Sequence, residues 1–274
     1  WPKFLRWRAI NPGAASTYPR IQLLRLMPLR QRFFVEACYR ERPGGRSALA
    51  PLGPDRDARF WHTWWVQRLR VLVVITRGEP GGAQMHVLEL VRGLRNSVEL
   101  HVAVGDEEFL AGEIRLLGVP VTIVAGLQRD VAAGADLRAI RALRTIIRTF
   151  SPHLVHTHSS KAGLVGRAAA WSLGVPSIHT AHAWSFSDGI PWRRKGWTIP
   201  VEAAVGRITD RFIVVSRADR EVGMRFGVAR DAQVRIVHNG VADGDARGNP
   251  GLPGPITVLM VARMAEPKDP RLLL

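Results

Sequence analysis

The sequence is most informative at residues 69–94, which read LRVLVVITRGEPGGAQMHVLELVRGL. An aliphatic run at 69–75 is followed by a turn that contains glycines, and then by apolar residues spaced for one face of a helix. A strand that is apolar at nearly every position is typical of a parallel sheet covered by helices on both faces. The segment therefore predicts the first strand, turn and helix of an α/β fold.

The same alternation of short aliphatic runs and longer amphipathic stretches continues along the chain. We predict strands at 69–75, 98–104, 120–124, 153–156, 176–181, 211–215 and 234–237. We predict helices near 83–95, 106–117, 133–150, 161–173, 193–208 and 217–226. This order predicts a Rossmann-like, doubly wound parallel sheet, on which ligands bind beyond the carboxyl ends of the strands.

The segments on either side of this unit differ in composition. Residues 1–68 mix Trp, Arg and Pro without a sustained period, which predicts an irregular, poorly ordered basic extension, with a surface anchor as the alternative. Residues 69–241 form the predicted domain, and the stretch rich in Gly and Pro at 242–255 is a predicted linker. Residues 256–274 then begin a second unit that the sequence does not finish.

Composition excludes several classes of protein. The 274 residues include 39 basic and 23 acidic side chains, for a net charge of +16, which first suggests a binder of nucleic acid or anionic membrane. However, residues 1–70 hold 14 of the basic and 4 of the acidic side chains, so most of the excess lies in the extension. Because Cys38 is the only cysteine, an internal disulfide framework is excluded. No apolar run reaches the roughly 18 residues that a membrane-spanning helix needs.

Polar side chains follow two successive strands of the predicted sheet. His158, Ser159 and Lys161 come after the strand at 153–156, and His182 follows the next strand. Because the carboxyl ends of parallel strands lie at one edge, we expect these residues to line a common site. We favour His158 and Lys161 over His156, which we expect to pack in the core. We also take His156 and His158 to face opposite sides of the strand, and so to be poor ligands for one metal ion.

Three further patterns could bind anions. The turn with Gly81 and Gly82 allows backbone N–H groups at a helix start to approach a phosphate, with a plain tight turn as the alternative. Arg263 and Lys268 follow the last aliphatic run and suit a diphosphate. The basic aromatic segment 192–197 predicts a solvated face, with contact to anionic lipid as the alternative.

Taken together, these segments resemble the retaining glycosyltransferases of family 4, which have the two-domain GT-B fold. The resemblance covers about 69–274 and is carried by the order and spacing of several motifs. These are Gly81-Gly82-Ala83-Gln84, His156-Thr157-His158-Ser159-Ser160-Lys161-Ala162-Gly163, His179-Thr180-Ala181-His182, Val215-Ser216, Ile236-Val237-His238-Asn239-Gly240-Val241 and Val261-Ala262-Arg263 through Lys268.

The resemblance implies that residues 69–241 are the acceptor-side half of a GT-B enzyme. Such an enzyme transfers a hexose from a UDP- or GDP-sugar to a lipid-linked or polysaccharide acceptor, with retention and without a metal or other cofactor. It implies that His182 contacts the donor sugar and acts in catalysis, while Arg263, Lys268, Gly81 and Gly82 bind the donor phosphates. The implied acceptor or site-lining residues are His158, Ser159, Lys161, Ser216 and Asn239.

The same resemblance carries further expectations and leaves two alternatives. The family's paired glutamates belong well beyond Lys268, so we expect the chain as given not to turn over. A cytoplasmic protein is implied, with contact to the anionic inner face of the plasma membrane left open and no nucleic-acid partner. One alternative is a sugar-nucleotide epimerase of the same fold. The other is a non-catalytic basic module that binds membrane or nucleic acid.

Overall fold

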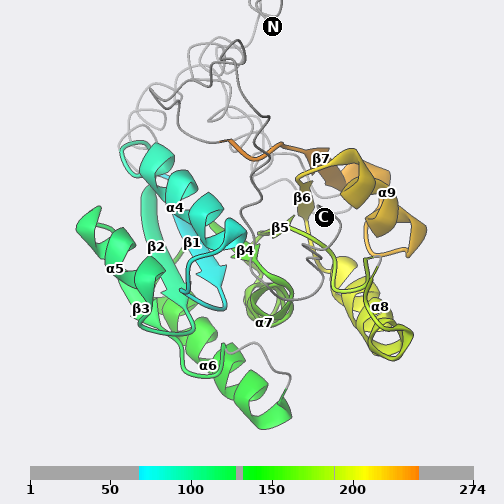
Figure 1. The fold of residues 1–274 in the computed structure, drawn as a ribbon. Coiled ribbons are helices and arrows are strands. Elements are labelled where there is room, and N and C mark those ends of the chain that lie inside the picture. Colours follow the sequence, from blue (N-terminus) through cyan, green and yellow to red (C-terminus); the bar gives the residue numbers. More distant parts are fainter. Residues whose placement is uncertain (1–67, 128–131, 188, 241–274) are drawn as a thin grey trace, which may run out of the picture. The chain divides into compact units, whose positions relative to one another are not determined.

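The described part of the chain is built on a seven-stranded parallel sheet. The computed structural model describes residues 68–127, 132–187 and 189–240. The strands lie in the order β3-β2-β1-β4-β5-β6-β7, and each neighbouring pair is parallel (Figure 1). Their bounds are β1 Arg70–Ile75, β2 Glu99–Val104, β3 Val121–Ile123, β4 Leu154–His158, β5 Ser177–Ala181, β6 Arg211–Val214 and β7 Val234–Ile236. The predicted Rossmann-like α/β class is confirmed.

Helices connect the strands, as parallel pairing requires. They are α4 Gly82–Leu94, α5 Phe109–Leu116, α6 Ala133–Phe150, α7 Ser160–Trp171, α8 Trp192–Gly206 and α9 Arg217–Arg225, with a short 3-10 turn at Asp231–Gln233. Each predicted element is present, with ends that differ by at most three residues. The difference that matters is at β4, which runs two residues beyond its predicted end and so includes His158.

Burial of aliphatic side chains on the sheet explains this architecture. Residues 71–75 of β1 are each at most 1% exposed, as expected of a strand with helices on both faces. On α6, the buried residues Ala139, Leu143 and Ile147 recur at helical spacing and pack with α7 against Leu72 of β1. A second apolar cluster joins β5 and β6 to α8 and α9 through residues such as Phe186 and Phe212.

The topology fixes where a ligand can bind. From β1 the chain moves outward through β2 and β3, and it then returns to place β4 on the other side of β1. The connections after β1 and β4 therefore leave the sheet in opposite directions at its carboxyl edge. This reversal opens a crevice between them in doubly wound folds, and it makes the ends of β1, β4 and β5 the place to examine.

Close packing between α7 and β5 yields a first prediction, at Gly163. A Cβ atom at this position would lie 2.5 Å from Cε1 and 2.8 Å from Nδ1 of the buried His179 ring. Because the His179 ring is buried and its Nδ1 lies 3.0 Å from the Thr157 hydroxyl, we expect Gly163→Ala to lower the free energy of unfolding by about 1–3 kcal/mol, the usual cost of overpacking. Urea unfolding followed by circular dichroism measures this change.

The matched control is Gly112→Ala on α5. A Cβ at Gly112 would meet nothing within 4 Å, and the residue lies in a helix. Alanine there should raise stability by about 0.5–1 kcal/mol, because glycine is the poorer helix former. Equal effects of the two substitutions would show that contact with His179 does not determine the outcome at Gly163.

Several predictions concern residues outside the described ranges. These are the extension 1–68 apart from Arg68, the linker 242–255, the second unit 256–274, and the phosphate-binding roles of Arg263 and Lys268. In the ranges that are described, no helix combines the length and the apolar character needed to cross a bilayer.

Candidate functional site

Three histidines from separate elements meet at the carboxyl edge of the sheet. His158 is the last residue of β4, His182 directly follows β5, and His86 lies in the second turn of α4. The ring centroids are 4.9 Å apart for His86 and His182, 5.4 Å for His158 and His182, and 5.7 Å for His86 and His158. The cluster lies beside the reversal between β1 and β4, where this fold class binds its ligands.

The hydrogen bonding of this cluster leaves ring nitrogens unused. Nδ1 of His158 lies 3.2 Å from Nε2 of His182, so one ring donates to the other. The opposite nitrogens, Nε2 of His158 and Nδ1 of His182, are buried and have no hydrogen-bond partner among the described residues. An unsatisfied buried polar atom costs about 1–3 kcal/mol, so these two nitrogens mark a place where a ligand would be stabilised.

Burial keeps the three imidazoles uncharged. It lowers the pKa of His182 to about 4, and the electrostatic effect of His86 is a smaller second cause. It holds the pKa of His158 well below its usual range, with His156 and His182 as further causes. Burial also lowers the pKa of His86, against a smaller opposing effect of a hydrogen bond to Asn239. At neutral pH each ring can therefore donate one hydrogen bond and accept another.

His156 is a core residue whose ring lies next to the cluster. It is 1% exposed, and its Nε2 lies 2.8 Å from the hydroxyl of Thr180 on β5. Its ring centroid is 4.2 Å from that of His158. The prediction that these two histidines face opposite sides of β4 is wrong, because residues two apart on a strand point to the same face.

Ser159 links the ends of β1 and β4. Its hydroxyl lies 2.9 Å from the hydroxyl of Thr76, directly after β1. Its φ of 66° with ψ of 151° lies in a region that residues with a Cβ rarely adopt. Such a conformation costs about 1–3 kcal/mol and is found most often at functional sites. Ser159 thus places a strained backbone directly between His158 and the start of α7.

The turn between β1 and α4 is held by side chains on both sides. The Gly78 N–H donates to the Asp106 carboxylate at 2.7 Å, and the Gln84 side-chain amide donates to the Arg77 carbonyl at 2.9 Å. A Cβ at Gly82 would meet nothing within 4 Å, so packing does not require glycine there. The open backbone at the start of α4 is compatible with the predicted approach of a phosphate, which remains a prediction.

Two other predicted site residues make contacts within the fold. Lys161, in the first turn of α7, forms an ion pair with Asp136 of α6, with the Lys161 side chain 5% exposed. The Ser216 hydroxyl accepts a hydrogen bond from the Asp219 N–H at 3.0 Å and caps α9. Each residue thus has a partner within the fold, and the site-lining roles of both remain predictions.

The sequence interpretation missed His86, Asp136 and Arg167. His86 carries a usable signal, because it lies one helical turn after the Gly81-Gly82 pair and so remains near the carboxyl edge. Arg167 lies on α7 and is fully buried. It donates to the Gly163 carbonyl at 2.7 Å and to the Glu202 carboxylate at 2.7 Å. Its charge also contributes, after burial, to the low pKa of His179.

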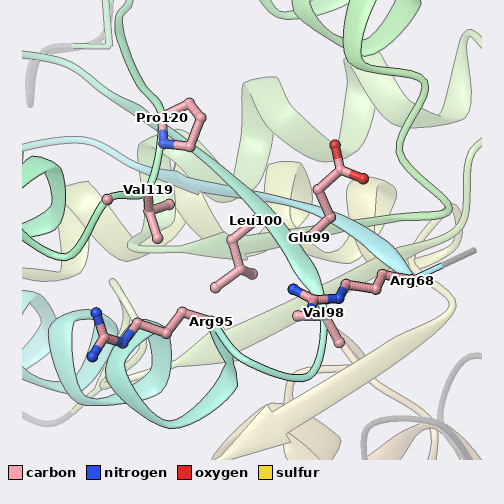
Figure 2. A pocket seen from close by; sticks show the side chains of 8 residues that line it. Arg68, Arg95, Val98, Glu99, Leu100, Val119 and Pro120 are labelled. Atoms are coloured by element: carbon pink, nitrogen blue, oxygen red, sulfur yellow. The ribbon is translucent and has the colours of Figure 1, made fainter.

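A hollow lies at the opposite edge of the sheet from the histidines. It has a volume of about 330 Å³ and lies where β1, β2 and β3 begin (Figure 2). It is lined by Arg68, Arg95, Val98, Glu99, Leu100, Gly118, Val119 and Pro120. Because open α/β sheets bind ligands at the carboxyl ends of the strands, this hollow carries no functional assignment.

The buried histidines predict that the fold loses stability in mild acid. Their pKa is near 6.5 in the unfolded chain and lower in the folded chain, to about 3 for His156 and about 4 for His182. Below pH 6.5 the unfolded chain binds more protons, so stability is full above that value and falls as the pH drops toward 4. The slope is up to about 1.4 kcal/mol per pH unit for each histidine.

Urea unfolding at pH 7.5 and at pH 5.5, with a chelator present, measures this loss. Carboxylates stay ionised across most of that interval, since their ordinary pKa values are near 4. Equal free energies of unfolding at the two pH values would contradict the assignment of these histidines as buried and neutral.

Comparisons with known proteins bear on the same part of the chain. The family model described as Glycosyltransferase Family 4 matches residues 80–244. The UDP-Gal:alpha-D-GlcNAc-diphosphoundecaprenol alpha-1,3-galactosyltransferase of Escherichia coli is 28% identical over 138 residues, which is 49% of this chain and 34% of that protein. The Escherichia coli O-antigen biosynthesis glycosyltransferase WbnH is 24% identical over 202 residues, 73% of this chain and 56% of that protein. The chain thus spans about a third to about half of these relatives.

Solved structures support the fold. Anabaena HepE in complex with UDP-glucose aligns with a TM-score of 0.51 at 15% identity, over 63% of this chain and 44% of that chain. A UDP-N-acetylglucosamine 2-epimerase aligns with a TM-score of 0.50 at 14% identity, over 63% of this chain and 49% of that one. Likeness at this level of identity shows the fold alone. The family match covers more than half of the chain and includes every element that forms the histidine cluster, and the chain therefore belongs to glycosyltransferase family 4.

Proposed function

We propose that this chain is the acceptor-side domain of a hexosyltransferase that extends a lipid-linked or polysaccharide acceptor. The observation that carries the proposal is the meeting of His158 and His182 at the carboxyl edge, within the segment that matches the family. In the proposed reaction an acceptor hydroxyl replaces the nucleoside diphosphate at the anomeric carbon of a UDP- or GDP-hexose. The hydroxyl proton leaves with the diphosphate, and the anomeric configuration is retained.

His182 is the proposed catalytic residue. Because its pKa is about 4, the ring is neutral at the pH of transfer and binds a sugar hydroxyl by hydrogen bonding and not as a cation. Its buried Nδ1 has no partner within the described residues and is available to the donor sugar. His158 positions the ring by the 3.2 Å contact between Nδ1 of His158 and Nε2 of His182. Because the His182 ring is already held in place, it needs little reorientation to stabilise the charge that develops in the transition state.

Other residues have proposed binding roles. We assign the donor phosphates to Gly81 and Gly82 together with Arg263 and Lys268, of which the glycines lie at the start of α4. Partial positive charge at a helix start and a guanidinium with an ammonium all favour a diphosphate. Charge compensation of this kind makes a metal unnecessary for departure of the leaving group. The acceptor would lie against Ser159 and Asn239.

Transfer to a lipid-linked acceptor calls for contact with a membrane surface. The start of α8 offers a basic aromatic surface, since Trp192 is 77% exposed and Trp197 46% exposed beside Arg193, Arg194 and Lys195. Amphipathic aromatics and cations suit the headgroup region of an anionic bilayer. Sedimentation with anionic vesicles should be weakened by Trp192→Ala and unaffected by Trp171→Ala, an exposed tryptophan on α7. Equal binding of both variants would exclude the α8 surface.

The transfer proposal is tested with the intact protein that contains this chain. It is incubated with a panel of UDP- and GDP-hexoses and an undecaprenyl-diphosphate-linked sugar, in the presence of a chelator. We expect an elongated lipid-linked product that NMR shows to have the anomeric configuration of the donor. Interconversion of sugar nucleotides without an acceptor would instead show an epimerase. A requirement for added metal would overturn the metal-independent part of the proposal.

A further inference from the structure

The three clustered histidines present their ring nitrogens to one another. His86, His158 and His182 each offer one nitrogen, and the three atoms all lie within 4.8 Å of one another. They come from α4, the end of β4 and the residue after β5, so the tertiary fold assembles them. In the described residues this is the group of three or more His, Cys, Asp or Glu side chains with such spacing.

The spacing of one pair is that of two ligands on a single metal ion. Zinc binds histidine nitrogen at about 2.0–2.1 Å with tetrahedral geometry, which places neighbouring ligand nitrogens about 3.3 Å apart. Nδ1 of His158 and Nε2 of His182 are 3.2 Å apart. In the metal-free chain a proton is shared between them, and a metal ion between the two nitrogens would replace that proton.

The His86 ring is placed to supply the third ligand. His86 is half-buried on the first part of α4, so its side chain can turn without disturbing the core. Its hydrogen bond with Asn239 orients the ring from outside the cluster. Partners of this kind fix the ring orientation of histidines that bind metals.

The chemistry of the donors selects the class of ion. Three uncharged imidazoles suit Zn²⁺, Ni²⁺ and Cu²⁺, whereas Mg²⁺ and Ca²⁺ require oxygen ligands. Three histidines also leave the fourth tetrahedral position open to water or a substrate oxygen. The site is therefore suited to zinc and unsuited to magnesium.

We propose that His86, His158 and His182 form a binding site for a zinc-class divalent ion at the carboxyl edge of the sheet. A bound ion takes the nitrogens that face the cluster, including that of His182. If His182 contacts the donor sugar through Nδ1, as the proposed function holds, an ion on Nε2 of the same ring replaces the contact with His158 that positions the ring for the sugar. Zinc is then a reversible inhibitor of the enzyme, and only this consequence rests on the proposed function.

Metal binding is measured on the 274-residue chain without an affinity tag, by isothermal titration calorimetry and by competition with a fluorescent chelator. We expect one Zn²⁺ per chain with micromolar or tighter affinity, a higher melting temperature with zinc, and no effect of Mg²⁺. Substitution with Co²⁺ should give the visible absorption bands of a four- or five-coordinate ion. None of these measurements involves a sugar.

Variants at the cluster separate this site from other histidines. His86→Ala and His182→Ala remove half-buried side chains that would bind the ion directly. Loss of a residue that only hydrogen-bonds to a metal ligand weakens metal binding by about 10–100-fold, so each of these variants should weaken zinc binding by more than that. His238→Ala is the matched control, because His238 is exposed and lies outside the cluster. Circular dichroism shows whether each variant is folded.

Two results would overturn the site, and a third would overturn its consequence. The site would be overturned if the wild-type chain did not bind zinc at about 100 µM, a concentration well above the dissociation constants of ordinary zinc sites in proteins. Equal zinc affinity in folded His86→Ala, His182→Ala and wild-type chains would do the same. If zinc binds at the cluster but saturating zinc leaves sugar transfer by the intact enzyme unchanged, the inhibitory consequence is wrong and the site stands.

Discussion

Replacing His182 with alanine should reduce sugar transfer by the intact enzyme about 10²–10³-fold, which is the usual cost of losing one positioned hydrogen-bond donor. The ring lies at the carboxyl edge of the sheet, and the fold fixes it from two sides. Nδ1 of His158 contacts its Nε2 at 3.2 Å, and the His86 ring packs against it edge-on at 4.9 Å. Alanine removes Nδ1, which has no partner in the part of the chain that the structure describes and would meet the donor sugar.

The kinetic signature distinguishes catalysis from substrate binding. Because the interaction should strengthen as charge develops at the anomeric carbon, kcat should fall more than KM rises. Initial rates at several donor concentrations, all with a chelator present, give both constants. A rise in KM with unchanged kcat would make His182 a binding residue only.

The matched control is His153→Ala. His153 precedes β4 at the opposite edge of the sheet, where its Nδ1 accepts the Arg70 N–H at 2.9 Å. Its removal should leave transfer near the wild-type rate. Wild-type activity in a folded His182→Ala enzyme would remove His182 from the site, and equal losses in both variants would point to damage to the fold.

Replacing Glu202 with glutamine should lower the free energy of unfolding by about 3–5 kcal/mol, because it leaves the buried Arg167 charge without its carboxylate. Arg167 is completely buried, and its Nη2 lies 2.7 Å from Oε2 of Glu202. Its other N–H groups donate to the Gly163 carbonyl and to the Thr209 hydroxyl, and neither acceptor carries a charge. The pair joins α7 to α8, and α7 packs against β5. Loss of the pair should therefore also make β5 less stable.

An exposed ion pair provides the comparison. Arg92 and Glu89 on α4 are 2.8 Å apart with side chains 42% and 35% exposed. Glu89→Gln should change stability by less than about 1 kcal/mol, because water already solvates both charges. Urea unfolding of the two variants measures the difference, and similar small losses would mean that Arg167 has another source of compensation.

A double variant tests the physical reason. Arg167→Met with Glu202→Leu removes both charges and keeps side-chain volume, so it should be much closer to wild-type stability than Glu202→Gln alone. A double variant as unstable as the single one would show that packing or the Thr209 contact, and not the unpaired charge, explains the loss.

The patterns in the sequence were sufficient for the fold. Apolar runs such as 71–75 and amphipathic stretches such as 133–150 predicted the strands and helices to within three residues. Both signals are local, since they depend on the period at which apolar side chains recur. The class of fold places ligands beyond the carboxyl ends of the strands, and this rule directed attention to the segments around His158 and His182.

The side-chain arrangement at the site was harder to predict from the sequence than the fold. His158 and His182 were found because they follow strands, but His86 was missed because it lies within a helix, one turn after the Gly81-Gly82 pair, and the sequence interpretation considered only that pair as a possible anion site. Lys161 was taken as a site residue, yet its ion pair with Asp136 joins α7 to α6 and cannot be read from either segment alone. The pairing of Arg167 with Glu202 was missed for the same reason.

The order of strands and helices, the family and the edge of the sheet that matters are all properties of the linear sequence, because periodicity and motif spacing are encoded along the chain. The tertiary structure alone brings His86, His158 and His182 together and buries them enough to stay neutral. Within residues 68–127, 132–187 and 189–240 it also leaves two of their ring nitrogens without a hydrogen-bond partner. Those properties arise from distances and from exclusion of water between segments that are up to 96 residues apart, counted from His86 to His182. They exist only once the sheet has formed.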